Sequence, residues 1–255
     1  MKSPALLLGM LVMSMSACAF DLDKLKARIN ELEQPATTST PPAPNSAGLA
    51  QFSAQEQTDS LKQALTQGAE TAVRNLAKEN GYLGNDKVRI PLPENLQKAD
   101  HTLRKFGLGK YSDELITSMN RAAETAVPEA KTLLIGAVKN MTVTDAKDIL
   151  LGNDDAATQY FRRSTETALG ERFKPIVTQS MQKVSLAQTY DRFAGKGAKL
   201  GLVKEQDVHL EDYITRKALD GLFLMMAEQE KEIRAHPMQA AGDLAQKVFA
   251  ALRGK

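Results

Sequence analysis

Several residue types that carry recognisable chemistry are scarce in this chain of 255 residues, which has one cysteine, three histidines and no tryptophan. A single cysteine excludes a disulfide framework. The histidines are scattered and form no His-Glu-x-x-His pattern, so we expect no metal site. No Gly-x-Ser-x-Gly segment is present to hold a serine nucleophile. The sequence therefore predicts no cofactor.

An excess of charge of either sign is also missing. The chain has 33 basic and 31 acidic residues, and removing residues 1–17 would take away only Lys2. A nucleic-acid-binding protein needs a basic surface, so we expect no nucleic-acid partner. The glycine-rich segments 195–201 and 106–111 lack the spacing of nucleotide-binding loops. No long hydrophobic run follows the N-terminal one, and a membrane span needs about 20 residues.

The first residues have the pattern of a processed export signal. Lys2 precedes an apolar run from Ala5 to Met13, and small residues lead up to Cys18. Met15-Ser16-Ala17-Cys18 resembles the lipobox of bacterial lipoproteins, which implies cleavage after residue 17 and acyl chains on Cys18. Ala19 follows, which by the same resemblance favours the outer membrane, with the protein on its periplasmic face. The alternative is an ordinary secretory peptide, cut near Ala17 or Ala19.

Two short segments separate this signal from the rest. Residues 18–33 would hold the acylated cysteine and an amphipathic helix, because Leu22, Leu25, Ile29 and Leu32 share one helical face. This helix is too short to be stable alone, so it would lie on the membrane, pair with another helix or dock on the domain. Residues 34–48, rich in Pro, Thr and Ser, are typical of a linker with a reach of about 20 to 45 Å.

Residues 49–255 predict an all-α fold, a single bundle of about eight to ten helices. Ser53 and Glu56 have the spacing of a capping box at its start. We expect Ser112, Thr144, Asn153 and Asp212 to cap later helices, a break between helices near residue 170, and a flexible loop at Gly195, Gly197 and Gly201. Two short extended segments, 88–90 and 208–210, have room to pair as a two-stranded clip.

One helix, opened by Asn153, carries most of the candidate ligand-binding residues. Asp155, Gln159 and Arg162 are three or four positions apart and share a face, and the candidates in this segment are Asp154, Asp155, Gln159, Arg162 and Arg163. Paired arginines grip phosphate or carboxylate groups. The structural alternative is that the acidic residues complement the helix dipole and the others form a solvated, paired face.

Asp220 is the second candidate, because residues 218–227 around it are apolar on nearly every side and predict a buried helix. A buried carboxylate needs a cation, and we expect Arg121, Arg162 or Arg163 as its partner. Such a pair either fixes the register of helices or, in a cleft, marks a site.

Four strings carry a family resemblance: VRIPLPENLQKAD, GLGKYSDELITSMNRAAETAVPEA, GNDDAATQYFRRSTETALGERFKPIV and DYITRKALDGLFLMMAEQEKEIR. They resemble the shared blocks of a family of exported Gram-negative bacterial proteins classed as a domain of unknown function, over roughly residues 50 to 250. The resemblance implies a helical domain behind a signal peptide and no assigned activity.

Two functions are compatible with these residues. The first is a non-enzymatic lipoprotein tethered to the outer membrane, which binds an envelope protein or a small apolar or anionic ligand. The alternative is an envelope hydrolase or transferase that uses Asp154, Asp155, Arg162 and Asp220.

Overall fold

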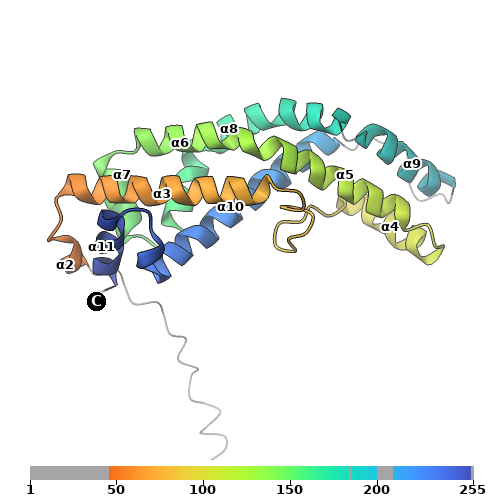
Figure 1. The fold of residues 1–255 in the computed structure, drawn as a ribbon. Coiled ribbons are helices and arrows are strands. Elements are labelled where there is room, and N and C mark those ends of the chain that lie inside the picture. Colours follow the sequence, from red (N-terminus) through yellow and green to blue (C-terminus); the bar gives the residue numbers. More distant parts are fainter. Residues whose placement is uncertain (1–45, 184, 200–208, 254–255) are drawn as a thin grey trace, which may run out of the picture. The chain divides into compact units, whose positions relative to one another are not determined.

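The computed structural model describes residues 46–183, 185–199 and 209–253, so Cys18, the predicted helix at 21–33 and most of the predicted linker lie outside the described residues. In the described ranges the chain is helical and contains no strand, which confirms the all-α prediction. None of their helices is both long and apolar enough to cross a membrane. Figure 1 shows the elements, which are α2 (Ser46–Leu49), α3 (Ala54–Leu76), α4 (Glu94–Lys105), α5 (Lys110–Ala126), η1 (Val127–Glu129), α6 (Ala130–Asn140), α7 (Val143–Leu151), α8 (Ala156–Lys183), α9 (Leu186–Lys199), α10 (Leu210–Ala235), η2 (Pro237–Gln239) and α11 (Asp243–Leu252).

The long helices α3, α8 and α10 form the body of the bundle. Helix α10 packs on α8 and α3, while α6, α7 and α11 cover α3. Helix α5 continues the bundle from η1 and packs on α8 and α9 (Figure 1). The largest fully buried side chains are Tyr82, Phe161, Phe173, Phe193 and Phe223. Burial of each such side chain contributes about 1.5 to 3 kcal/mol, which accounts for stability without disulfides.

One of the predicted N-cap residues is confirmed, and others differ from the caps that the structure shows. Ser53 caps α3 in a full capping box with Glu56, as predicted. For α7 the cap is Thr142, which pairs with Asp145, so the prediction of Thr144 was wrong by two residues. Helix α5 begins at Lys110, and Ser112 is buried inside it. Ser46 to Gly48, placed at the end of the predicted linker, belong to α2, whose Gly48 lies against the backbone of Ala251.

Two predicted breaks are continuous helix. Helix α8 runs through residue 170, and Pro175 lies within it rather than in a separate helix. The predicted flexible loop at Gly195 and Gly197 falls in α9, while Gly201 lies outside the described residues. Packing outweighs glycine's low helix propensity here, because Phe193 is fully buried and α9 contacts α5 along its length.

Among the described residues the predicted clip of 88–90 with 208–210 has no strand, and Leu210 is the first residue of α10; Val208 lies outside the described residues. Ile90 instead bonds to the side chain of Asn120 in α5. The Asn120 Oδ1 accepts from Ile90 N–H at 2.8 Å, and Nδ2 donates to Ile90 O at 2.9 Å. A carboxamide has both a donor and an acceptor, so it replaces the partner strand.

The prediction that residues 218–227 are buried all round was also wrong. Leu224 is 41% exposed and the Asp220 side chain 47% exposed. Gly221, next to Asp220 in the chain, is buried, and a Cβ there would lie 2.8 Å from the Tyr82 ring. Thus α10 turns one face to the extended segment after α3 and another to solvent.

Candidate functional site

The structure divides the predicted site residues among three places. Asp155, Gln159 and Arg163 line a hollow between α7 and α8, while Asp154 beside them is exposed. Arg162, one position before Arg163, turns to Asp220 on α10. Arg121 lies beside the turn that follows α3. Neighbouring positions on a helix point about 100° apart, which is why the two arginines separate.

The hollow between α7 and α8 has a volume of about 280 Å³, and two of its three carboxylates, Asp145 and Asp155, already have structural partners. Asp145 accepts from Thr142 in the α7 cap, and Asp155 accepts from Gln159 at 3.0 Å. The bonds from Thr142 lower the pKa of Asp145, and the charge of Arg163 adds to this shift. A general acid at neutral pH needs a raised pKa, so Asp145 is shifted away from that role.

Arg162 is the cation beside Asp220, at 3.4 Å, and it also pairs with Glu166 at 2.9 Å. Its guanidinium stacks on the Phe223 ring, 4.6 Å from the centroid. All three charged side chains are between one third and one half exposed, so the group is a partly solvated network that links α8 to α10. Surface networks of this kind contribute little free energy.

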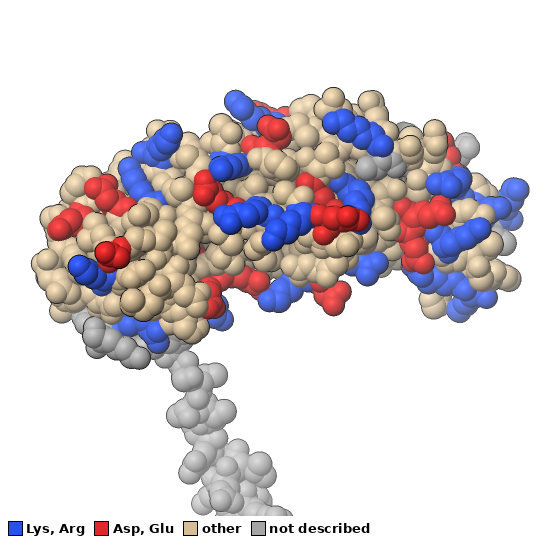
Figure 2. All heavy atoms as spheres, viewed as in Figure 1, with Lys and Arg blue, Asp and Glu red and all other residues tan. Residues whose placement is uncertain are grey.

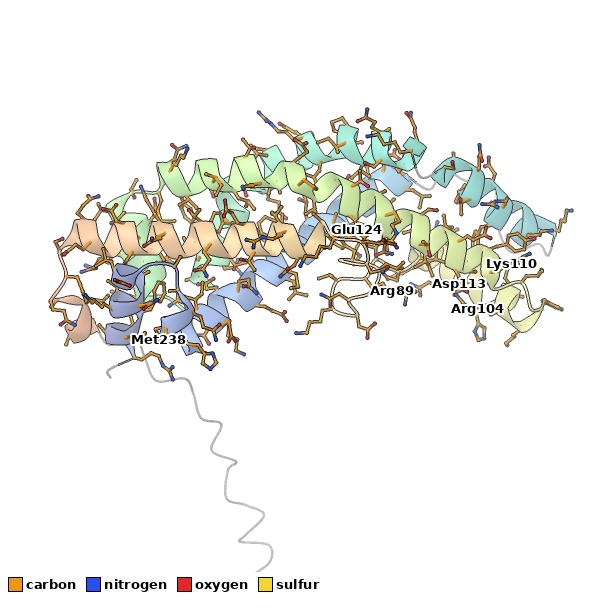
Figure 3. The ribbon with its side chains drawn as sticks, in the orientation of Figure 1. Arg89, Arg104, Lys110, Asp113, Glu124 and Met238 are labelled. Atoms are coloured by element: carbon orange, nitrogen blue, oxygen red, sulfur yellow. The ribbon has the colours of Figure 1, made fainter. Side chains whose placement is uncertain are left out.

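Glu124 in α5 is a buried carboxylate that sequence reasoning missed. Its side chain is 5% exposed, and Oε1 accepts from the backbone N–H groups of Tyr82 and Leu83 at 3.1 Å. Arg121 pairs with Oε2 and also reaches Glu79 and Asn80. Figure 3 shows Glu124 facing the segment that joins α3 to α4. The sequence signal was its position inside a stripe of buried alanines at 122, 123 and 126.

The same turn contains the fully buried Tyr82, whose hydroxyl donates to Ala218 O on α10 at 2.8 Å. Burial raises the pKa of Tyr82 strongly, and the charge of Glu124 adds to the shift. The phenol therefore stays protonated and acts as a hydrogen-bond donor that fixes α10 to the turn.

Glu230 in α10 is the second buried carboxylate, with a side chain 6% exposed. It accepts from the N–H groups of Ala157 and Thr158 at 2.9 and 3.0 Å, so a residue of α10 caps the start of α8. Arg234 pairs with Glu230 at 3.0 Å and donates to Ile149 O at the end of α7. Burial raises the pKa of Glu230, against the opposing effects of Arg234 and the backbone donors. This pair satisfies two helix ends at once.

A further hollow is an open groove of about 510 Å³ on α3, α6 and the turn before α11. We call it the α3–α6 groove; its lining residues are Lys62, Gln63, Thr66, Gln67, Glu70, Arg74, Val138, Lys139 and Ala241. One wall is fixed by Gln67, which donates to Gln239 O at 3.0 Å and accepts from Ala241 N–H.

The charges of the α3–α6 groove are unequal. Three cations line it, Lys62, Arg74 and Lys139, against one acid, Glu70. Glu70 pairs with Lys131 at 3.0 Å, and Lys62 donates to Lys139 O at 3.1 Å. The guanidinium of Arg74 and the ammonium of Lys139 have no partner among the described residues. The groove therefore offers cations and amide groups to a ligand.

His209, Glu211 and Asp212 place one ligand atom each within 4.8 Å of one another at the start of α10. Lys174 already bonds Asp212 at 2.6 Å, and this bond lowers the pKa of Asp212. His209 is exposed and contacts Glu211 at 3.3 Å. A Lys ammonium occupies the carboxylate that a cation would need, so this group has the geometry of an ion-pair cluster.

The fold and these side chains define an all-α domain whose buried charges join helix ends. Among the described residues, the predicted catalytic carboxylates do not converge with a nucleophile. The chain belongs to the family described as protein of unknown function (DUF4197), which matches residues 51–250. No curated protein and no solved structure matches it.

Proposed function

We propose that this chain is a non-enzymatic binding lipoprotein of the Gram-negative envelope. Its acylated Cys18 would anchor it to the periplasmic face of the outer membrane, and the linker would hold the helical domain near the bilayer. The lipobox-like residues before Cys18 support the anchor. Several acyl chains on one residue give firm membrane binding, because each buried methylene contributes about 0.8 kcal/mol.

The observation that carries the binding role is the α3–α6 groove. Its volume lies in the range of small-molecule sites, and its unpaired Arg74 and Lys139 favour an anionic ligand that carries carboxylate or phosphate. Gln63 and Thr66 add neutral donors and acceptors to the same wall. The groove therefore supports recognition of a ligand that carries an anionic group.

The alternative function, an envelope hydrolase or transferase, requires Asp154, Asp155, Arg162 and Asp220 in one site. Asp220 pairs with Arg162 on α10 and α8, whereas Asp155 lines the hollow beside α7. The separation of Asp155 from the Asp220–Arg162 pair favours the binding function.

Native mass spectrometry of the detergent-solubilised full-length protein tests both parts of the proposal. We expect a mass increase from acyl chains at Cys18, and a second increase from a bound anionic molecule. The second increase should disappear in the double variant Arg74→Glu, Lys139→Glu and persist in Arg172→Glu, an exposed α8 position outside the groove. An unmodified thiol would overturn the anchor, and a ligand mass unchanged in the double variant would overturn the groove assignment.

A further inference from the structure

The turn between α4 and α5 presents an exposed aromatic side chain on a rigid backbone. Gly107 has a φ of +72°, its N–H donates to Arg104 O at 3.0 Å, and Leu108 N–H donates to Leu103 O at 2.8 Å. These two bonds close the end of α4 in the way that glycine-terminated helices do. Phe106, just before the glycine, is 66% exposed. The fixed turn therefore holds an apolar ring in solvent, where it can gain free energy by entering an apolar environment.

Lysines surround this turn, and the two nearby aspartates share one arginine. Arg104 pairs with Asp100 at 2.8 Å and with Asp113 at 2.6 Å. Lys105 and Lys110 on either side of Phe106 are exposed and pair with no carboxylate among the described residues. Figure 3 shows Arg104, Asp113 and Lys110 together where α4 meets α5. One arginine balances only one of these two aspartates, so Arg104, Asp100, Asp113, Lys105 and Lys110 together carry a net charge of +1.

Helix α9 adds further positive charge from the other side. Arg192 pairs with Glu114 at 3.2 Å, and the Lys196 ammonium lies 5.2 Å from the centre of the Tyr111 ring. Helices α9 and α5 run antiparallel, with Arg192 beside Glu114 and Lys196 beside Tyr111. Lys199 is about one helical turn beyond Lys196, which brings it to the level of the turn between α4 and α5. Figure 2 shows Lys and Arg side chains gathered at the end formed by α4 and α9. We call Lys105, Phe106, Lys110, Lys196 and Lys199 the basic tip.

We propose that the basic tip docks on an anionic phospholipid surface, independently of the acyl anchor. An aromatic ring enters the headgroup region of a bilayer, while lysines at its edge meet lipid phosphates. One exposed ring gives too small an apolar area for a specific protein interface, which buries about 800 Å² on each partner. A second copy of this tip is excluded by like charge. Charge complementarity therefore favours an anionic membrane.

The absence of tryptophan allows a direct test, because Phe106→Trp introduces a single fluorophore at the tip. The chain from residue 18 with Cys18→Ser serves as the starting protein, since it keeps all of the described residues, which lie within 46–253. Vesicles of phosphatidylcholine are compared with vesicles that also contain phosphatidylglycerol. We expect Trp emission to shift to shorter wavelength only with phosphatidylglycerol. Met238→Trp, an exposed position on η2 far from the tip in Figure 3, should show no shift.

Charge reversal tests the lysines. The double variant Lys105→Glu, Lys110→Glu should lower partitioning onto the anionic vesicles by about tenfold or more. Arg172→Glu should leave it unchanged, and circular dichroism should show equal helix content in all variants. Equal binding to neutral vesicles, an unshifted Phe106→Trp, or unchanged binding of the double variant would overturn the proposal. A dimer in sedimentation whose interface covers the basic tip would also overturn the proposal. The protein used in these experiments begins at residue 18 and carries Cys18→Ser, so it has no acyl anchor. None of these results therefore depends on the proposed lipoprotein function.

Discussion

The body of the domain and the basic tip differ in how they hold charge. In the body Glu230 and Arg234 are nearly buried, and together they bond the ends of α7 and α8. At the tip Lys105 and Lys110 are exposed, and only the arginines there pair with the local acids. Buried charge must be fully partnered because desolvation is costly, whereas exposed charge is free to meet another surface. Charge in the body therefore supports folding, and charge at the tip supports contact.

Among the variants that test this comparison, Glu230→Ala should change the free energy of unfolding most. The variant leaves Arg234 without its carboxylate and the start of α8 without its cap, so we expect a loss of about 3 to 5 kcal/mol in the free energy of unfolding. Urea denaturation measures this loss. Glu228→Ala on the same helix removes an exposed pair with Lys87 and should cost less than about 1 kcal/mol. Similar losses in both variants would contradict a special role for the buried pair.

Asn120→Ala should have the next largest effect. It leaves the buried N–H and C=O of Ile90 without partners, which we expect to cost about 2 to 4 kcal/mol. Thermal melting measures the change, since each kcal/mol corresponds to about 2 to 4 °C for a domain of this size. Asn140→Ala, at the exposed end of α6, is the matched control. If both variants melt at the same temperature, the Asn120 carboxamide does not stabilise the extended segment that contains Ile90.

A pH dependence separates the charge of Glu230 from its hydrogen bonds. Because the pKa of Glu230 is raised in the folded state, the folded protein keeps this proton to a higher pH than the unfolded chain. The contribution of this group to stability therefore falls as pH rises from the unfolded value near 4.5 through the folded pKa.

Glu230→Gln has no such titration, and the other groups titrate in both proteins. The stability of the wild type relative to Glu230→Gln should thus be greater at about pH 4 than at about pH 7. Urea titrations at both values give this difference. If the stability of the wild type relative to Glu230→Gln instead increases toward neutral pH, Arg234 lowers the pKa of Glu230 more than burial raises it.

A smaller effect is expected at the α7 cap. Thr142→Ala removes the hydroxyl that accepts from Asp145 N–H, and we expect a loss of about 1 kcal/mol. Thr144→Ala, two residues later in the exposed first turn, should change stability by less than about 0.5 kcal/mol. Chemical denaturation of the pair shows which threonine caps the helix.

The smallest effect on folding is expected at the tip. Phe106 is 66% exposed, so Phe106→Ser should change the free energy of unfolding by less than about 0.5 kcal/mol. The same variant should weaken binding to anionic vesicles, measured by co-sedimentation. A large loss of stability would make Phe106 part of the core and remove the contrast with the body.

Much of the fold could be predicted because helical periodicity and capping are local. Ser53 and Glu56 are three residues apart, so their capping box is visible in the sequence. The candidate site was harder, since Arg162 and Arg163 differ by one position yet face different neighbours. Glu124 and Glu230 have the sequence pattern of ordinary helical glutamates, because their backbone N–H donors come from residues about 40 or more positions away in the chain.

By itself the sequence determined an all-α domain, the capping box of Ser53 and Glu56, and the signal-like residues before Cys18, because each depends on neighbouring residues. The tertiary structure alone decided that Asn120 takes the place of a strand, that Glu230 caps α8, and that α9 continues through its glycines. In each case a group distant in the chain supplies the hydrogen bond or the packing that local propensity lacks.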